Sequence, residues 1–200
     1  MSTTLPAGGS ADHDPRIARS RAKVLAAATE LLVEAGPRGV TADAIAEHSG
    51  VAKSTLYRHW NSINELLLDV VRVNLPADTD VDLAVGFDAA LRGWVDRVVV
   101  ALSAPGWARI LSALLELRQH SPEMAALLTH DFDDKLSAMA SILDLGAAEG
   151  RLPAGLDPAL VTQTLSGPLV LTALSGDESR VAEVAGYVLG RFLASYPAQP

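Results

Sequence analysis

Apolar residues recur at intervals of three and four along most of the chain, which is the pattern of amphipathic helices. Ala and Leu dominate, and runs of β-branched residues are short. We therefore predict an all-α protein. The predicted helices span residues 15–35, 41–48, 52–59, 62–75, 81–103, 106–119, 122–149, 158–174 and 178–195.

A polar segment that contains proline, residues 76–80, interrupts this helical pattern and marks the predicted domain joint. The predicted division is a flexible tail over 1–14, a first domain over 15–60, a connecting helix over 61–76 and a second domain over 77–200. The tail lacks the apolar segment of a signal peptide, and nothing later reaches the ~18 consecutive apolar residues that a membrane-spanning helix needs. Because cysteine is also absent, we expect a cytoplasmic protein without a membrane partner.

Charge is distributed unevenly along this acidic chain. Residues 1–75 contain eight basic and eight acidic side chains, a net charge of 0, whereas residues 76–200 contain eight and sixteen, a net charge of −8. Within the first part, residues 49–64 contain no Asp or Glu, although Lys53, Arg58 and His59 lie there among hydroxyl and aromatic side chains. An acid-free, locally cationic segment is suited to contact phosphates.

The same region has the spacing of a helix-turn-helix. Ala46 suits a close helix contact, Gly50 follows four residues later at the turn, and Leu56 follows six residues after that as a core residue. The side chains expected to face inward are Ile45, Ala46, Leu56 and Trp60. The second short helix then displays Lys53, Ser54, Tyr57 and Arg58 outward, where a recognition helix enters the major groove of DNA.

Residues 19–71 resemble the N-terminal DNA-binding domain of the tetracycline-repressor (TetR) family of transcriptional regulators. The resemblance rests on "RSRAKVLAAATELLVEAG", "TADAIAEHSGVAKSTLYRHW" and "NSINELLLDVV" at their offsets. More weakly, "SPEMAALL", "AAEGRLPAGLDP" and "LSGPLVLTALSG" resemble the ligand-binding domain of one subgroup. The resemblance implies a three-helix DNA-binding domain followed by a helical ligand-binding and dimerisation domain. It also implies a homodimeric repressor that leaves a palindromic operator when a small-molecule effector binds.

Carried over to this chain, the resemblance makes Thr41, Tyr57 and His59 phosphate contacts. It places Lys53, Ser54, Thr55 and Arg58 against bases or phosphates. A basic arm before and within the first helix comprises Arg16, Arg19 and Arg21. The chain departs from the family at Ile63, where related sequences usually place a cation, and at Asn61 and Ala52.

Large adaptable apolar side chains of the second domain are candidates for an effector cavity or for plain core. They are Trp94, Trp107, Met124, Phe132 and Met139. The implied dimer interface lies on the last two long helices, for which the candidates are Leu165, Leu169, Val181, Val184, Val188 and Phe192.

Other classes of function find less support in the sequence. Its five histidines are scattered and the motifs of nucleophilic, phosphate-binding and zinc enzymes are absent, so we expect no catalysis and no cofactor. The acidic residues at 130–134 point in different directions on one helix, so we interpret them as a solvated face and expect no metal site. An activator of the same fold, or a helical module that binds only other proteins, remains the alternative to a repressor.

Overall fold

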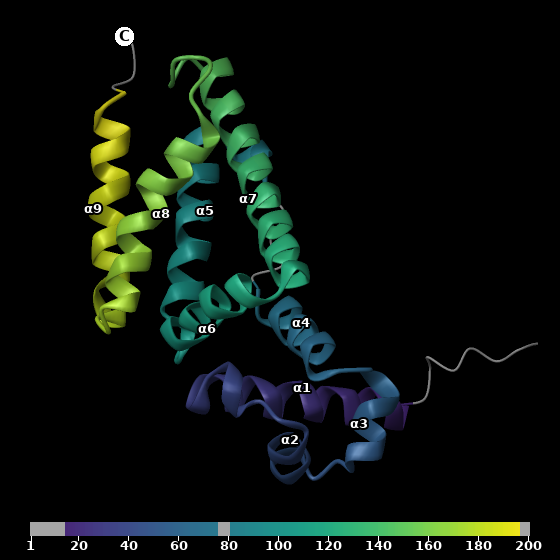
Figure 1. Ribbon diagram of the computed structural model, residues 1–200. Helices are drawn as coiled ribbons and strands as arrows, with labels where there is room; N and C mark the ends of the chain where they lie inside the picture. The colour runs from purple at the N-terminus through teal and green to yellow at the C-terminus, as the bar shows by residue number, and fades with distance from the viewer. Residues whose placement is uncertain (1–14, 76–80, 197–200) are drawn as a thin grey trace, which may run out of the picture. The chain divides into compact units, whose positions relative to one another are not determined.

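The computed structural model describes residues 15–75 and 81–196, which contain helices and no strand (Figure 1). The prediction of an all-α fold is confirmed for these residues. The predicted tail over 1–14 and the predicted joint over 76–80 lie outside them. The α-helices are α1 (Pro15–Ala35), α2 (Ala42–Ser49), α3 (Lys53–His59), α4 (Ile63–Asn74), α5 (Phe87–Leu102), α6 (Trp107–His120), α7 (Pro122–Ala148), α8 (Pro158–Leu174) and α9 (Val181–Ala194). Three short 3₁₀ helices are η2 (Pro37–Gly39), η3 (Leu83–Val85) and η4 (Glu178–Arg180).

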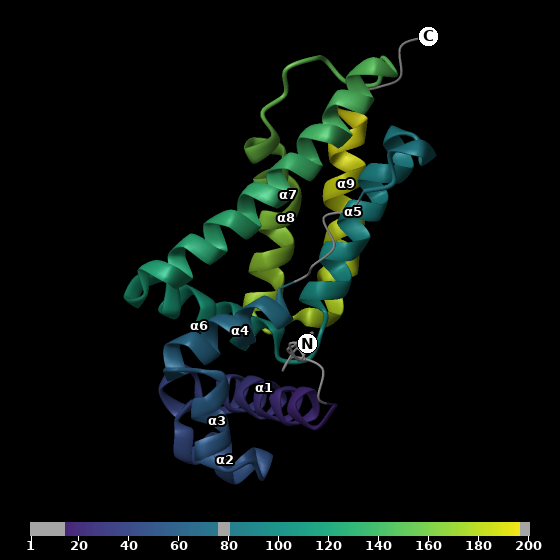
Figure 2. The ribbon, with the colours of Figure 1, turned by 90° about the vertical axis from the view of Figure 1, so that its right-hand side faces the viewer.

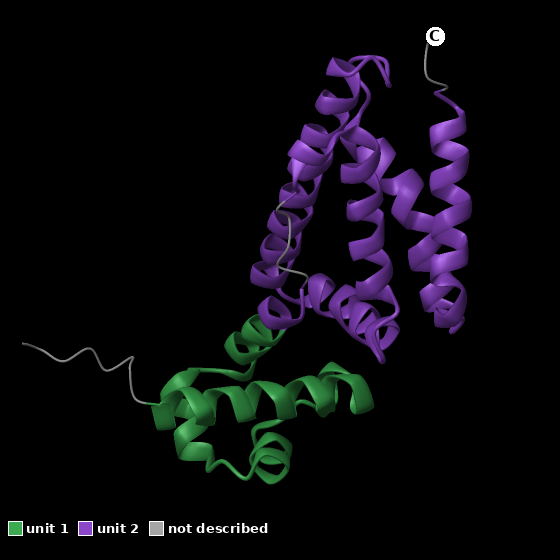
Figure 3. Ribbon diagram, turned by 180° about the vertical axis from the view of Figure 1, so that it is seen from behind, with its two compact units in different colours: residues 1–70 green, residues 71–200 purple. Residues whose placement is uncertain are grey.

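The chain forms two compact units, residues 1–70 and 71–200, which we call the head and the body (Figure 3). The boundary between them falls inside α4.

The head packs α1, α2 and α3 around a small apolar core. Val24 and Leu32 of α1, Ile45 of α2 and Leu56 of α3 are all buried, and Trp60 closes the core after α3 with 2% of its surface exposed. Two inward-facing side chains of the predicted turn motif, Ile45 and Leu56, are fully buried as expected. Burial of large apolar side chains is what holds α2 and α3 in place, because isolated helices of 8 and 7 residues are marginal in water.

The body is built around α5, α7, α8 and α9 (Figures 1 and 2). Apolar side chains of these four helices form one core. Leu91 of α5, Ile142 of α7, Leu169 of α8 and Val181 of α9 are examples of its fully buried members. Helix α6 runs across one end of this bundle, and its axis is bent by 89° from that of α5. No single helix among the described residues has the length and apolar composition to cross a membrane. Among these residues, only the bent pair of α5 and α6, taken together, has that length and composition.

The first helix of the body begins later than the sequence pattern predicts. We expected a helix over 81–103, but residues 83–85 form the 3₁₀ helix η3, and α5 starts at Phe87. Gly86 has φ of +83°, a conformation outside the α region that separates the two helices. The Asp82 side chain accepts a hydrogen bond from the Ala84 amide and so stabilises the separate turn.

Three of the predicted interface residues belong to the body's own core. Leu165 and Leu169 are 1% exposed and Val181 is fully buried, so these side chains have no surface left for a second subunit. The expectation that they form a dimer interface is replaced by a core role. The remaining three, Val184, Val188 and Phe192, are partly buried and pack against the same core. Apolar residues at intervals of three and four indicate that one face of a helix is buried. The pattern is the same whether that face is buried in the core of the subunit or in an interface between subunits.

Candidate DNA-binding surface and ligand cavity

Local hydrogen bonds set the positions of α2 and α3. The Thr41 hydroxyl accepts a hydrogen bond from the Ala44 amide at 3.2 Å, which caps α2. Gly50 ends α2 with φ of +67°, a left-handed conformation that glycine adopts without steric cost. The chain then re-enters a helix at Lys53, after Ala52, which contributes no side-chain cap. The two helices are therefore separated by only three residues, as in a helix-turn-helix.

Helix α3 is divided into a buried face and an exposed face. Leu56 is fully buried, whereas the four side chains predicted to face outward are exposed: Lys53, Ser54, Tyr57 and Arg58. Tyr57 leaves 52% of its surface exposed, which is a large value for an aromatic residue. Thr55 and His59 are half-buried at the edges of this face. The exposed face therefore carries donors and acceptors and no carboxylate of its own.

His59 has an unusual environment. Its Nε2 atom is buried and has no hydrogen-bond partner among the described residues. Its ring centroid lies 5.4 Å from that of Trp60. The phosphate contact that the resemblance implies for His59 stays a prediction, because this atom is not accessible at the surface.

Two of the predicted DNA contacts are engaged inside the head. The Lys53 ammonium forms an ion pair with Asp43 on α2. The Arg21 guanidinium donates to Asp69 at 2.6 Å and lies over the Trp60 ring. Contact of either cation with DNA requires it to exchange a carboxylate for a phosphate. Arg16 and Arg19 are exposed at the start of α1.

The side chains at the start of α4 hydrogen-bond with one another and with the backbone of the same turn. The Ser62 hydroxyl accepts from the Glu65 amide at 3.1 Å and so caps the helix. The Glu65 carboxylate accepts from the amide of Asn61 at 2.7 Å. Ile63, where the resemblance leads us to expect a cation, is half-buried at the first position of the helix.

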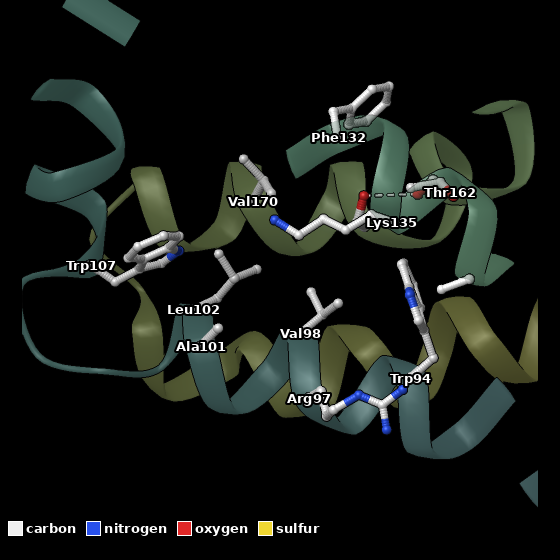
Figure 4. Close-up of a pocket in the computed structure, with 12 residues that line it drawn as sticks. Trp94, Arg97, Val98, Ala101, Leu102, Trp107, Phe132, Lys135, Thr162 and Val170 are labelled. Carbon is white, nitrogen blue, oxygen red and sulfur yellow. Dashed lines mark hydrogen bonds between the residues drawn. The ribbon is translucent and has the colours of Figure 1, made fainter. Parts of the chain in front are cut away.

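The body contains a cavity of about 200 Å³ among α5, α6, α7 and α8 (Figure 4). Its lining residues are Trp94, Arg97, Val98, Ala101, Leu102, Trp107, Phe132, Lys135, Ala138, Thr162, Ser166 and Val170. Most of these side chains are apolar, with a few polar groups between them, as in typical small-molecule sites.

The structure sorts the five predicted cavity residues into two groups. Trp94, Trp107 and Phe132 line the cavity, whereas Met124 and Met139 are fully buried and do not line it. The two methionines are therefore core residues. Both explanations that the sequence left open, cavity and core, apply to different members of the set.

Sequence reasoning missed the polar residues of the cavity, although one signal for them exists. Positions 94, 97, 98 and 101 share one face of a helix, so Arg97 lies on the same face as Trp94 and Val98. A cation inside an apolar stripe is a departure from the amphipathic pattern. Lys135 and Thr162 carry no comparable signal, because their neighbours in the cavity come from other helices.

Together these features define a two-part protein, a helix-turn-helix head of the DNA-binding type and a helical body that contains a mostly apolar cavity. Comparison with known proteins gives the same class. The family model of the bacterial regulatory proteins of the tetR family matches residues 24–70, and that of the tetracyclin repressor-like C-terminal domain matches residues 86–188.

Relatives of similar length carry the same assignment. The chain is 27% identical to the HTH-type transcriptional regulator AqdR of Rhodococcus erythropolis over 76% of this chain and 73% of that protein. It is 26% identical to the HTH-type transcriptional regulator YdeS of Bacillus subtilis over 89% and 90% of the two chains. The fold also resembles that of a TetR-family regulator from Mesorhizobium loti, with a TM-score of 0.70 at 21% identity over 92% of this chain and 99% of that one.

The chain therefore belongs to the tetR family of bacterial regulatory proteins. It is a DNA-binding transcriptional regulator whose DNA-binding domain contains α2 and α3.

Proposed function

We propose that this regulator is a cytoplasmic homodimer without catalytic activity, and that it represses transcription from a near-palindromic operator until a small molecule fills the body cavity. The observation that carries the proposal is the exposed face of α3. Lys53, Tyr57 and Arg58 project from it, while Leu56 and Trp60 hold the helix on the head from behind. A recognition helix inserts such a face into the major groove, and the flanking cations neutralise phosphates.

The homodimer is supported by an exposed apolar stripe on α8 and α9. Leu160, Leu171 and Leu174 of α8 are 63%, 66% and 41% exposed, and Tyr187 of α9 is 70% exposed. A Cβ atom built on Gly190 of α9 would meet no atom within 4 Å, so a partner helix can approach that position closely. These residues replace the buried ones as the proposed interface. A two-fold dimer would present two α3 helices to half-sites separated by about one helical turn or a multiple of it.

Effector control is supported by the cavity in the body. A ligand shifts the protein between conformations only by its difference in affinity for them, so the effector must bind a conformation that has low affinity for the operator. An activator would use the same head and cavity with the opposite effect on transcription. A reporter gene placed behind the operator, in cells with and without the regulator, distinguishes the two because a repressor lowers the signal.

The experiment that tests the DNA surface is fluorescence anisotropy with a duplex selected by the wild-type protein. We expect Tyr57→Ala or Lys53→Glu to weaken binding by about 1–3 kcal/mol, the usual scale for such contacts. Arg118→Glu is the control, because it makes the same charge change at an exposed position of α6 in the body. If both head variants bind the duplex as tightly as the wild type, α3 is not the recognition helix.

The dimer is tested separately by light scattering. Leu171→Asp should give monomers, because it places a charge in the proposed apolar interface. Leu115→Asp, at a 49% exposed position of α6, should leave the mass unchanged. A Leu171→Asp protein that remains dimeric places the interface elsewhere.

A further inference from the structure

The polar groups of the body cavity include several that are buried without a partner. Arg97 Nη2, Trp107 Nε1 and Thr162 Oγ1 have no hydrogen-bond partner among the described residues. Only two further side-chain atoms in the described part of the chain share this state, so three of the five lie at one site. Thr162 is 5% exposed and cannot turn to water instead. Because buried polar groups are almost always paired, this concentration marks the cavity as a site that can bind a polar ligand.

The unpaired atoms are mostly hydrogen-bond donors. A guanidinium and an indole N–H can only donate, whereas the Thr162 hydroxyl can donate or accept. The Ser166 hydroxyl donates to the Thr162 carbonyl at 2.7 Å, which leaves its oxygen lone pairs toward other groups. The ligand must therefore supply acceptors at several points.

The charge of the lining has one sign. Arg97 and Lys135 are its two cations, and no Asp or Glu belongs to the lining. Lys135 is neutralised by an ion pair with Asp131, four residues earlier on α7. Arg97 has no ion pair among the described residues, so its charge is the one that a ligand can balance. A cationic ligand would instead add an unfavourable charge beside it.

Size and wall chemistry restrict the ligand further. The cavity volume of about 200 Å³ lies below the ~300–1,000 Å³ of ordinary ligand sites. Trp94 lies at one end of the cavity in Figure 4 and Trp107 at the other, with Val98 between them. A compact ligand with an aromatic or short aliphatic group fits this space.

We propose that the cavity binds a compact amphipathic carboxylate, whose charged group accepts hydrogen bonds from Arg97 and whose apolar part lies along the tryptophan side chains. A carboxylate offers about four acceptor positions on two oxygens, which matches a site where donors are in excess. Charge-assisted hydrogen bonds of this kind are roughly twice as strong as neutral ones. The proposal rests on the cavity's role as the effector site.

The test is isothermal calorimetry of the full-length protein, without DNA, against three probes of matched shape: 3-phenylpropanoate, 3-phenylpropanol and 3-phenylpropylamine. We expect the acid to bind at least tenfold more tightly than the alcohol, and the amine to bind most weakly. Arg97→Met should remove the preference for the acid over the alcohol, and Arg97→Lys should retain part of it. Arg92→Met, an exposed arginine on the same helix, should bind all three probes like the wild type.

Binding of the alcohol or the amine as tightly as the acid overturns the proposal, as does failure of all three probes to bind at millimolar concentration. These outcomes are read on the wild type, so they do not depend on how a variant folds. DNA binding is measured in parallel by anisotropy. A protein that binds its operator but shows no preference for the acid refutes the ligand class alone. A protein that binds the acid through Arg97 yet keeps its operator supports the ligand class and refutes the effector role.

Discussion

Asp69 should be the most important polar residue for the stability of the head. One of its carboxylate oxygens accepts from Arg21 of α1 at 2.6 Å and from the Trp60 indole at 2.9 Å. Asp69, on α4, therefore links that helix to α1 and to Trp60, the residue that follows α3. Trp60 is 2% exposed, so removal of its acceptor leaves a buried N–H group without a partner.

The loss expected for Asp69→Ala follows from these two contacts. An unsatisfied buried donor costs about 1–3 kcal/mol, and the Arg21 pair, with side chains 45% and 18% exposed, contributes about 0–1 kcal/mol. A total of about 2 kcal/mol lowers the equilibrium protection of the head by about 30-fold. Arg21→Met keeps the indole bond and should cost about 1 kcal/mol, from the ion pair and the cation–π contact.

Hydrogen-exchange mass spectrometry is the appropriate assay, because it reads peptides of α1 and α3 separately from those of the body. Glu34→Ala is the control, since Glu34 is an exposed acid on α1, and it should change protection by less than about threefold. The reasoning is refuted if Asp69→Ala loses no more protection than Glu34→Ala. It is also refuted if Arg21→Met loses as much as Asp69→Ala, because the indole bond would then contribute nothing.

Three further predictions concern turn geometry, packing and pH. Gly50→Ala should destabilise the head by about 1–2 kcal/mol in urea unfolding, because its φ is left-handed although no atom lies within 4 Å of the added Cβ; no loss would show that the turn relaxes. Gly146→Ala should destabilise the body by about 1–3 kcal/mol in the same assay, since the new Cβ would lie 2.7 Å from a ring carbon of Phe87. The control is Gly167→Ala, whose Cβ would meet no atom within 4 Å and which should be neutral or slightly stabilising. Equal losses of stability in the two variants would contradict this account. The pKa of Glu183 is lowered by its hydrogen bond to Arg180 and by the positive charge of Arg180, so the stability that this carboxylate contributes is present above its unfolded pKa and is lost as the pH falls through its folded pKa. The difference in melting temperature between wild type and Glu183→Gln should therefore shrink below about pH 4. A difference that grows below this pH would contradict the direction of the pKa change.

The turn motif of the head could be predicted from sequence because its determinants are local. Thr41 caps α2, Gly50 ends it, and Leu56 follows at the spacing that a crossing of two short helices needs. Each of these signals acts within a few residues of the structure it specifies. The carboxylate that ties the head together could not be predicted, because Asp69 is 48 residues from Arg21 in the chain.

The body was less predictable because its features depend on contacts between distant helices. The apolar repeat of α9 correctly indicated a buried face, but periodicity does not state whether the subunit or a partner buries it. For the same reason the sequence could not tell that Trp94 lines the cavity whereas Met139 belongs to the core. Both are large apolar side chains on helices, and only the packing of α5 against α7 and α8 distinguishes them.

The most direct test of the central claim is selection of bound duplexes from a random pool by the full-length protein at near-physiological salt. A dimer that reads DNA through two copies of α3 should enrich a near-palindromic sequence whose half-sites are centred about 10 base pairs or a multiple of that apart. The Tyr57→Ala protein should enrich the same sequence only at a higher protein concentration, because a lost phosphate contact weakens binding to all duplexes alike. A pool that shows no enriched sequence, or a Lys53→Glu protein that enriches the palindrome as strongly as the wild type, would contradict the assignment of α3 as the recognition helix.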